Sequence, residues 1–233
     1  MLKIEKLTKS YDGNLIFENF DLEIEKNKIT CLIGKSGSGK TTLLNVLCGI
    51  TEEFTMEESD FTNLSYSYIF QEPRLLDWYT VYQNMKFVLS KDEVNHKDLK
   101  KHINNYLKMV ELENFSHYYP NQLSGGMAQR VSIARAFIKD FDVLLMDEPF
   151  KGLDPAQKKQ LIDRFMDMWK KNRKTVLFVT HLLEEAFYIS NDIFVLGDKP
   201  AKIVYSCKNV YKMEDEEKER EKEKIWQILE SQT

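Results

Sequence analysis

The stretch that decides the fold reads Gly34-Lys35-Ser36-Gly37-Ser38-Gly39-Lys40-Thr41. Its spacing, Gly-x-x-x-x-Gly-Lys-Ser/Thr, is typical of a loop that binds phosphate groups. The glycines let the backbone bend so that successive N–H groups converge on an anion, and the helix that follows offers free N–H groups as well. We therefore expect a bound nucleotide, with Lys40 near its β- and γ-phosphates and the Thr41 hydroxyl on Mg²⁺.

The segments around this loop predict a sheet of buried strands. Residues 28–33 form a short β-branched, apolar run, and residues 41–48 carry leucines at helical spacing. Further strands are predicted at 66–70, 143–146, 175–180, 193–196 and 203–205, and further helices at 81–114, 127–138, 161–169 and 183–189. This alternation predicts an α/β fold with a mainly parallel sheet.

The two ends of the chain follow other patterns. Residues 2–7 and 15–24 alternate apolar and polar side chains around a turn at 11–14, which predicts an antiparallel β subdomain. Residues 52–63 are acidic and polar, and we interpret them as a loop or a shortened hairpin. The tail at 211–233 predicts a charged, solvated helix that ends in a docked turn near residues 225–229.

Composition excludes several classes of protein. The chain has 233 residues, of which 42% are hydrophobic, so it can fill the core of a large domain. Lys+Arg 33 against Asp+Glu 37 give a net charge of −4, which disfavours a nucleic-acid partner. Cys31, Cys48 and Cys207 stand far apart, which is typical of free, buried thiols in a reducing cytosol. No apolar run reaches the roughly 20 residues of a spanning helix, and the N-terminus lacks the apolar core of a secretory signal.

A second motif places two acids after a buried strand, in Leu144-Leu145-Met146-Asp147-Glu148-Pro149. In folds with a phosphate loop, an acid at such a strand end holds Mg²⁺ through water, and we assign this to Asp147. Glu148 beside it is suited to orient or deprotonate an attacking water.

A third motif, Leu123-Ser124-Gly125-Gly126-Met127-Ala128-Gln129, precedes a helix. Ser124 is a suitable N-cap, and the exposed N–H groups of the glycines make a second anion-binding helix end. The residues alone are equally compatible with an ordinary capped helix.

In this order, the motifs resemble the nucleotide-binding subunit of an ABC transporter. The resemblance covers about residues 2–205 and includes Gln71, Gly152-Leu153-Asp154 and His181. It implies a P-loop NTPase of the ABC ATPase type at 1–210, a helical subdomain inserted at about 72–135, and the tail at 211–233. It also implies a dimer of identical or paired cassettes that encloses two ATP molecules.

The resemblance assigns a role to each motif residue. Tyr11 would stack on adenine, His181 would contact the γ-phosphate, and Asp154 would couple the two sites, although Tyr or His alone is more often ordinary packing. The implied ATP-binding set is Tyr11, Gly34, Lys35, Ser36, Gly37, Ser38, Gly39, Lys40, Thr41, Thr42 and Asp154, with Ser124, Gly125 and Gly126 acting from the opposite protomer. The implied catalytic set is Glu148, His181, Lys40 and Gln71, and the implied Mg²⁺ ligands are Thr41, Gln71 and Asp147.

A narrower similarity lies in Phe70-Gln71-Glu72-Pro73-Arg74-Leu75-Leu76-Asp77-Trp78. It is similar to the nitrate/sulfonate/taurine branch of importers, which also includes carriers of vitamin precursors, although Asp77 replaces the usual proline. The chain departs from the family in its short stretch between Gly49 and Tyr66 and in Leu182, where Asp is usual. Neither departure removes a catalytic group.

The importer interpretation implies transmembrane permease subunits, an extracytoplasmic solute-binding protein, and a peripheral location at the cytoplasmic face of the membrane. The alternatives are the ATPase of an exporter and a non-transport ABC protein of DNA repair or translation. Exporters often fuse the cassette to membrane helices, and the non-transport proteins usually have two cassettes or long insertions, none of which this sequence has. An apolar patch of Leu75, Leu76, Trp78, Tyr79 and Tyr82 either receives a short permease helix or packs the helical subdomain.

Overall fold

The computed structural model describes residues 1–89 and 98–231. Within these residues, a six-stranded sheet has the order β5-β6-β7-β3-β8-β9. Neighbours are parallel from β5 to β8, and β9 is antiparallel to β8. The strands are β3 (Ile29–Ile33), β5 (Tyr66–Ile69), β6 (Val143–Asp147), β7 (Thr175–Thr180), β8 (Asp192–Leu196) and β9 (Ile203–Cys207). The predicted α/β fold with a mainly parallel sheet is confirmed.

A smaller antiparallel sheet contains β1 (Leu2–Tyr11), β2 (Asn14–Ile24) and β4 (Glu58–Ser59). Asp12 and Gly13 join β1 to β2 with φ of 47° and 79°, the left-handed conformation that a two-residue hairpin turn requires. The acidic stretch at 52–63 contains the two residues of β4, and Thr55 within it forms an isolated bridge with Thr8 of β1. It is therefore a loop with the remnant of a hairpin.

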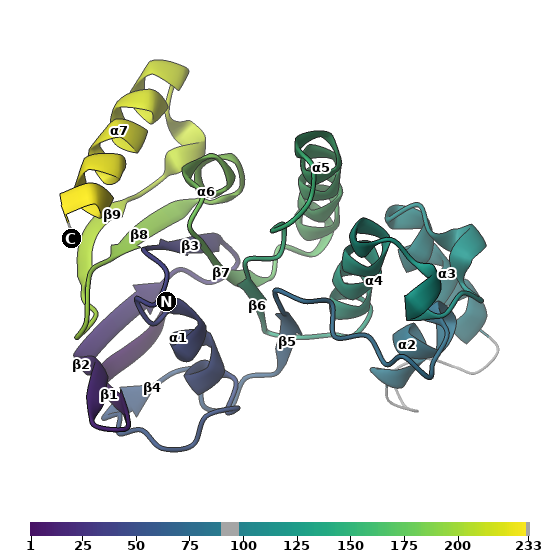
Figure 1. Cartoon of the computed structure of the whole chain (residues 1–233), viewed down its shortest axis with the longest axis horizontal. Coiled ribbons are helices and arrows are strands. Elements are labelled where there is room, and N and C mark those ends of the chain that lie inside the picture. Colours follow the sequence, from purple (N-terminus) through teal and green to yellow (C-terminus); the bar gives the residue numbers. More distant parts are fainter. Residues whose placement is uncertain (90–97, 232–233) are drawn as a thin grey trace.

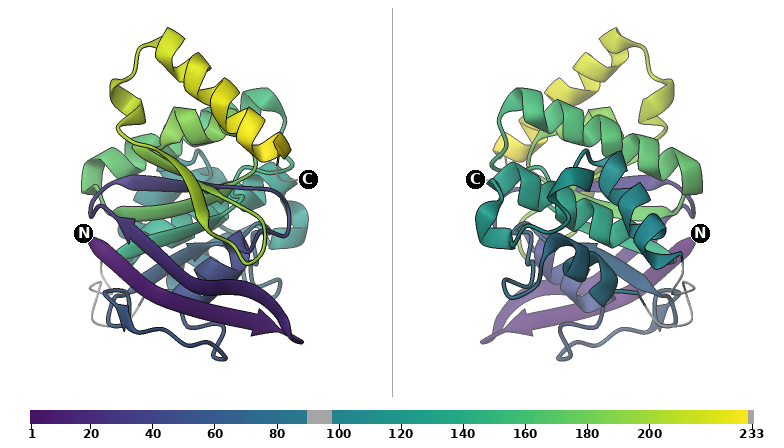
Figure 2. Two further views of the ribbon diagram at one scale, coloured as in Figure 1. Left: turned by 90° about the vertical axis from the view of Figure 1, so that its left-hand side faces the viewer. Right: turned by 90° about the vertical axis from the view of Figure 1, so that its right-hand side faces the viewer.

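The main sheet lies between two hydrophobic cores. Helix α1 (Lys40–Leu47) packs between the two sheets, where Leu44 joins Leu32 and Leu145 in one core. Residues of the opposite strand face, such as Met146 and Phe178, join the helices on the other side. Neighbours along a strand point to opposite faces, so these uniformly apolar strands supply both cores. Figure 2 shows β1 and β2 below the main sheet and the C-terminal helix above it.

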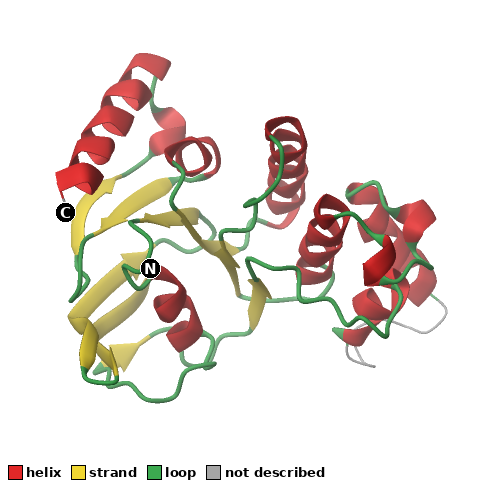
Figure 3. Cartoon of the chain, in the orientation of Figure 1, coloured by secondary structure: helices red, strands yellow, loops and turns green. Residues whose placement is uncertain are grey.

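The helical lobe holds α2 (Val81–Phe87), α3 (Leu99–Met109) and α4 (Gly125–Phe137), and lies to one side of the two sheets in Figure 3, with α4 packed against β5. The single predicted helix over 81–114 is therefore two helices, and residues 90–97 of that span lie outside the described residues. Helix α3 ends at Met109 because the chain enters the left-handed region at Glu111, with φ of 56°. Short 3-10 turns occupy Glu113–Phe115 and Pro120–Gln122.

Helix α5 (Pro155–Asn172) begins six residues before the predicted start. Asp154 caps its first turn and Pro155 fits the first helical position, but this turn is polar and exposed, so apolar periodicity does not reveal it. Helix α6 (Leu183–Ile189) has its predicted bounds.

The tail forms a 3-10 turn at Val210–Lys212 and helix α7 (Asp215–Ser231) (Figure 1). The helix continues through the apolar residues near its end, so the expected docked turn is wrong. Ile225 is buried in the core, while the Trp226 side chain on the same helix is 56% exposed.

Two other expectations concern the whole chain. The three cysteines are free, with Cys31 and Cys207 buried and Cys48 half-buried. Across residues 1–89 and 98–231, we find no helix that combines the length and the apolar character needed to cross a membrane.

Candidate nucleotide site

Four parallel strands bring the sequence motifs to one edge of the main sheet. The register pairs Ile33 with Thr180, Val179 with Asp147, and Met146 with Ile69. The strands β3, β7, β6 and β5 therefore end side by side. The loop at 34–39, His181, the Asp147–Glu148 pair and Gln71 all follow these strand ends, which is where open parallel sheets bind ligands.

The phosphate loop has a shape that only glycine fits at two positions. A Cβ on Gly34 would lie 2.9 Å from Ser38 Oγ and 3.0 Å from the Leu196 carbonyl oxygen. Gly39 has φ of 101°, and a Cβ there would lie 2.8 Å from Ile16 Cγ2. This close approach to Ile16 also fixes the β1–β2 hairpin against the start of α1.

Lys40 lies in the centre of the loop, with its side chain buried. Its Nζ donates to the carbonyl oxygens of Gly34 and Lys35, at 2.7 Å each. Burial lowers the pKa of Lys40, and the nearby carboxylates of Glu148 and Asp147 oppose that shift. The structure thus brings this lysine to the two acids of the second motif.

Asp147 is buried at the end of β6. Burial raises the pKa of its carboxyl, and a hydrogen bond with the Thr41 side chain acts in the opposite direction. Two predicted Mg²⁺ ligands from different elements therefore touch each other.

Glu148 has a left-handed backbone, with φ of 42°, and its N–H donates to the Val179 carbonyl at 3.0 Å. Its carboxylate lies 2.9 Å from His181 Nδ1 and 2.9 Å from Lys151 Nζ. Burial disfavours the charged carboxylate, but the hydrogen bonds from Lys151 and His181 outweigh it and lower the pKa of Glu148. The side chain is thus kept ionised, as a general base must be.

The remaining residues of the predicted set lie on other elements. Ser124 caps α4 through the Met127 N–H at 3.2 Å, and Asp154 caps α5. Figure 1 shows α4 in the helical lobe, apart from α1 and its phosphate loop. Gln71 is exposed after β5, and Tyr11 is 43% exposed at the end of β1. A single chain therefore does not bring residues 124–126 to its own phosphate loop.

Helix α4 links several of these segments. The buried Gln129 side chain donates to the Pro149 carbonyl at 2.5 Å, directly after the Asp147–Glu148 pair. The Arg135 guanidinium donates to the carbonyls of Pro73 and Arg74 at 3.0 Å each, just after Gln71.

Sequence reasoning missed these supporting residues. Arg135 acts through contacts with backbone carbonyls, and Lys151 acts through Glu148, whose side chain is placed by the fold. The one available signal was the position of Lys151, three residues after Glu148, which suits a contact across a tight turn.

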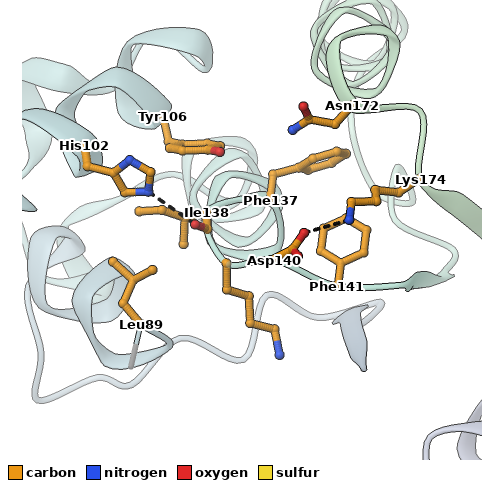
Figure 4. Close-up of a pocket in the computed structure, with 10 residues that line it drawn as sticks. Leu89, His102, Tyr106, Phe137, Ile138, Asp140, Phe141, Asn172 and Lys174 are labelled. Atoms are coloured by element: carbon orange, nitrogen blue, oxygen red, sulfur yellow. Dashed lines mark hydrogen bonds and ion pairs between the residues drawn. The ribbon is translucent and has the colours of Figure 1, made fainter. Parts of the chain in front are cut away.

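A separate cavity of about 260 Å³ lies at the other end of α4 (Figure 4). His102 and Tyr106 line it from α3, Phe137 lines it from α4, and Lys174 reaches Asp140 across 2.6 Å at its rim. None of its ten lining residues belongs to the predicted nucleotide set, so the cavity is not part of this site.

The fold and the site together define a P-loop nucleoside triphosphatase. Comparison with known proteins narrows this class. A sequence profile described as "ABC transporter" matches residues 17–151. The chain therefore belongs to the ABC transporter family, and it is an ATPase.

The most similar curated relatives include aliphatic sulfonates import ATP-binding proteins, named SsuB. That of Bacillus cereus is 39% identical over 194 residues, which cover 81% of this chain and 76% of that protein. The SsuB 1 protein of Pseudomonas savastanoi is 34% identical over 203 residues, which cover 87% of this chain and 83% of that protein. These relatives support the predicted importer branch.

Solved structures of the same family have the same fold. A dimeric ATP-binding cassette in a post-hydrolysis state bound to ADP and Pi has a TM-score of 0.75 and 27% identity, covering 89% of this chain and 98% of that chain. CbiO1 from Clostridium perfringens, part of the ABC transporter complex cbiONQ, has a TM-score of 0.76 and 25% identity. The match covers 90% of this chain and 88% of that chain.

Proposed function

We propose that this chain powers an importer of organic sulfonates by hydrolysing ATP at the cytoplasmic face of the membrane. The observation that carries the ATPase chemistry is the meeting of the phosphate loop, Asp147, Glu148 and His181 at one sheet edge. The sulfonate solute is inferred from the SsuB relatives. We assign residues 1–210 to the cassette, with its helical subdomain at about 72–135, and residues 211–233 to the tail.

In the proposed reaction, Lys40 and the N–H groups of residues 34–41 neutralise the β- and γ-phosphates. Glu148, kept ionised by Lys151 and His181, accepts a proton from the water that attacks the γ-phosphate. The His181 ring is held beside Glu148 and contacts the same phosphate. This arrangement supplies positioning and charge stabilisation, which dominate phosphoryl transfer.

The proposed metal is Mg²⁺, which prefers oxygen ligands. The buried Asp147 carboxylate and the Thr41 hydroxyl already contact each other, so the donor atoms present fit this ion. Thr41, Gln71 and, through water, Asp147 would hold it. When bound, Mg²⁺ neutralises charge that develops on the phosphates.

The proposed active form is a dimer. Residues 124–126 lie in the helical lobe with Gly125 in open space, so they are accessible to an ATP molecule held by a second chain. Dimeric cassettes among the solved relatives support this arrangement. Asp154, at the start of α5, would couple the two sites.

The proposed permease contact lies on the segment after Gln71. Trp78 is 70% exposed, and its ring lies 6.2 Å from that of Tyr79, which is 6.0 Å from that of Phe87. Leu75 and Tyr82 instead pack against the core, so part of the predicted apolar patch is structural. Trp78, Tyr79 and Phe87 form an aromatic row suited to anchor a short helix.

This segment is firmly held to the helical lobe. The buried Asn84 side chain accepts from the Leu76 N–H at 2.8 Å and donates to the carbonyls of Tyr79 and Thr80. With the Arg135 contacts to residues 73 and 74, these bonds would let movement at the γ-phosphate reach the aromatic row.

The experiment uses the chain assembled with its permease in proteoliposomes, together with the solute-binding protein. We expect an aliphatic sulfonate to stimulate ATP hydrolysis and to accumulate inside, while nitrate and a thiamine-like amine do not. Stimulation by nitrate or the amine alone would reject sulfonate import but keep the ATPase. Absence of ATP hydrolysis under every condition would reject the proposed function.

A further inference from the structure

Lys9 is a buried lysine that the nucleotide chemistry does not use. It lies on β1, two residues before Tyr11, and the residue is only 2% exposed. Its Nζ donates to the Glu53 carbonyl oxygen at 2.5 Å and lies 4.3 Å from the centroid of the Tyr11 ring. A buried charge is costly without partners, so these two contacts stabilise the Lys9 ammonium in this position.

One partner of Lys9, Glu53, belongs to the stretch between Gly49 and Tyr66, which the sequence comparison with the family predicts to be short. Backbone hydrogen bonds in both directions join Thr8 to Thr55, at 2.8 and 3.0 Å. The Tyr11 hydroxyl lies 3.5 Å from Thr51 Oγ1. Residues 51–55 therefore run beside the end of β1 and hold both Lys9 and the tyrosine ring.

We propose that Lys9 is a positioning residue for the adenine base, holding the Tyr11 ring against the segment 51–55 as a fixed stacking platform. This inference rests on the proposed function, which assigns adenine stacking to Tyr11. The lysine covers one face of the ring, and the 43% exposure of Tyr11 leaves surface for a base. A ring already held in place loses less rotamer freedom when the base stacks on it.

Lys9 should therefore affect the binding of the adenine base and the binding of the phosphates differently. The phosphates are bound by residues 34–41, whereas Lys9 contacts the ring and the segment after α1. Loss of Lys9 should weaken the contribution of the base to ATP affinity and leave the contribution of the phosphates unchanged.

The test is Lys9→Met, which keeps an apolar stem and removes the charge. Calorimetric titration of the full chain compares ATP with tripolyphosphate, which has no base. We expect ATP affinity to fall by about fivefold, in the range of one cation–π contact, and tripolyphosphate affinity to stay within about twofold. Lys9→Arg should restore ATP affinity, because the guanidinium also stacks on aromatic rings.

Lys6→Met is the matched control. Lys6 is an exposed lysine on the same strand that pairs with Glu57 at 2.7 Å, so it contacts the neighbouring segment without touching Tyr11. It should leave both affinities unchanged. If Lys9→Met does not fold, Lys9→Gln keeps an N–H for the Glu53 carbonyl and should show the same ATP-selective loss.

Equal weakening of both ligands, or of neither, would overturn the inference. Tyr11→Ala separates this failure from that of the proposed function. If Tyr11→Ala selectively weakens ATP binding while Lys9→Met and Lys9→Gln do not, Lys9 is not a positioning residue and the stacking assignment survives. If Tyr11→Ala leaves ATP affinity unchanged, both assignments fail.

Discussion

At the residue scale, the site depends on charges that are held by fixed backbone geometry. Lys40 has its ammonium among the carbonyl oxygens of its own loop, and Glu148 has its carboxylate between Lys151 and His181. The place of Lys40 at the end of the phosphate loop follows from the spacing of the motif, whereas its contacts with the Gly34 and Lys35 carbonyls were not predicted. The position of Lys151, three residues after Glu148, suits its contact with that carboxylate but does not specify it, because the contact also depends on the left-handed backbone at Glu148.

Lys40→Ala should abolish tight ATP binding. Each charge-assisted hydrogen bond contributes about 1.5–3 kcal/mol, so affinity should fall by about tenfold or more. Calorimetric titration with ATP and Mg²⁺ measures this, with Lys171→Ala, at an exposed lysine near the end of α5, as control. Unchanged affinity in Lys40→Ala would remove Lys40 from the site.

At the element scale, the strands were predictable and several helix boundaries were not. β7 and α6 have their predicted bounds, since uniformly apolar strands and amphipathic helices leave a clear pattern. The start of α5 was missed because a polar cap, and not an apolar residue, sets it. The single helix expected over 81–114 was wrong, because α2 ends at Phe87 and α3 ends at Met109, where the chain turns into the left-handed region at Glu111.

Asp154→Ala tests the cap of α5. The Asp154 carboxylate accepts from the N–H groups of Ala156 and Gln157 at 3.1 Å, and loss of such a cap costs about 1 kcal/mol of folding free energy. Urea unfolding should show this loss, while Asp154→Asn should retain most of the stability. Full stability in Asp154→Ala would show that the cap contributes nothing.

Trp78→Ala tests the proposed permease contact. The side chain is exposed, so folding and ATP hydrolysis by the isolated chain should stay within about twofold, while co-purification with the permease and solute uptake should fall. Trp226→Ala is the matched control, because this exposed tryptophan lies on α7, far along the chain from the aromatic row. If Trp78→Ala lowers hydrolysis and stability without a selective loss of permease binding, the row is structural.

At the scale of the whole molecule, we propose that each chain carries two separate halves of a nucleotide site. The phosphate loop and its acids lie at the edge of the main sheet, and residues 124–126 lie on the helical lobe (Figure 1). In this proposal, two chains bring these halves together around ATP, and Glu148 then supports hydrolysis.

The most direct test is the mass of Glu148→Gln in solution with ATP, measured by light scattering after size-exclusion chromatography. The amide keeps the shape of the side chain and loses the base, so we predict a stable ATP-bound dimer that does not turn over, and a monomer with ADP. Glu184→Gln, at an exposed glutamate on α6, should hydrolyse ATP normally and not accumulate as a dimer. Hydrolysis by Glu148→Gln at a rate near that of the unaltered chain would exclude Glu148 as the general base, and a monomer with ATP bound would exclude the ATP-bound dimer.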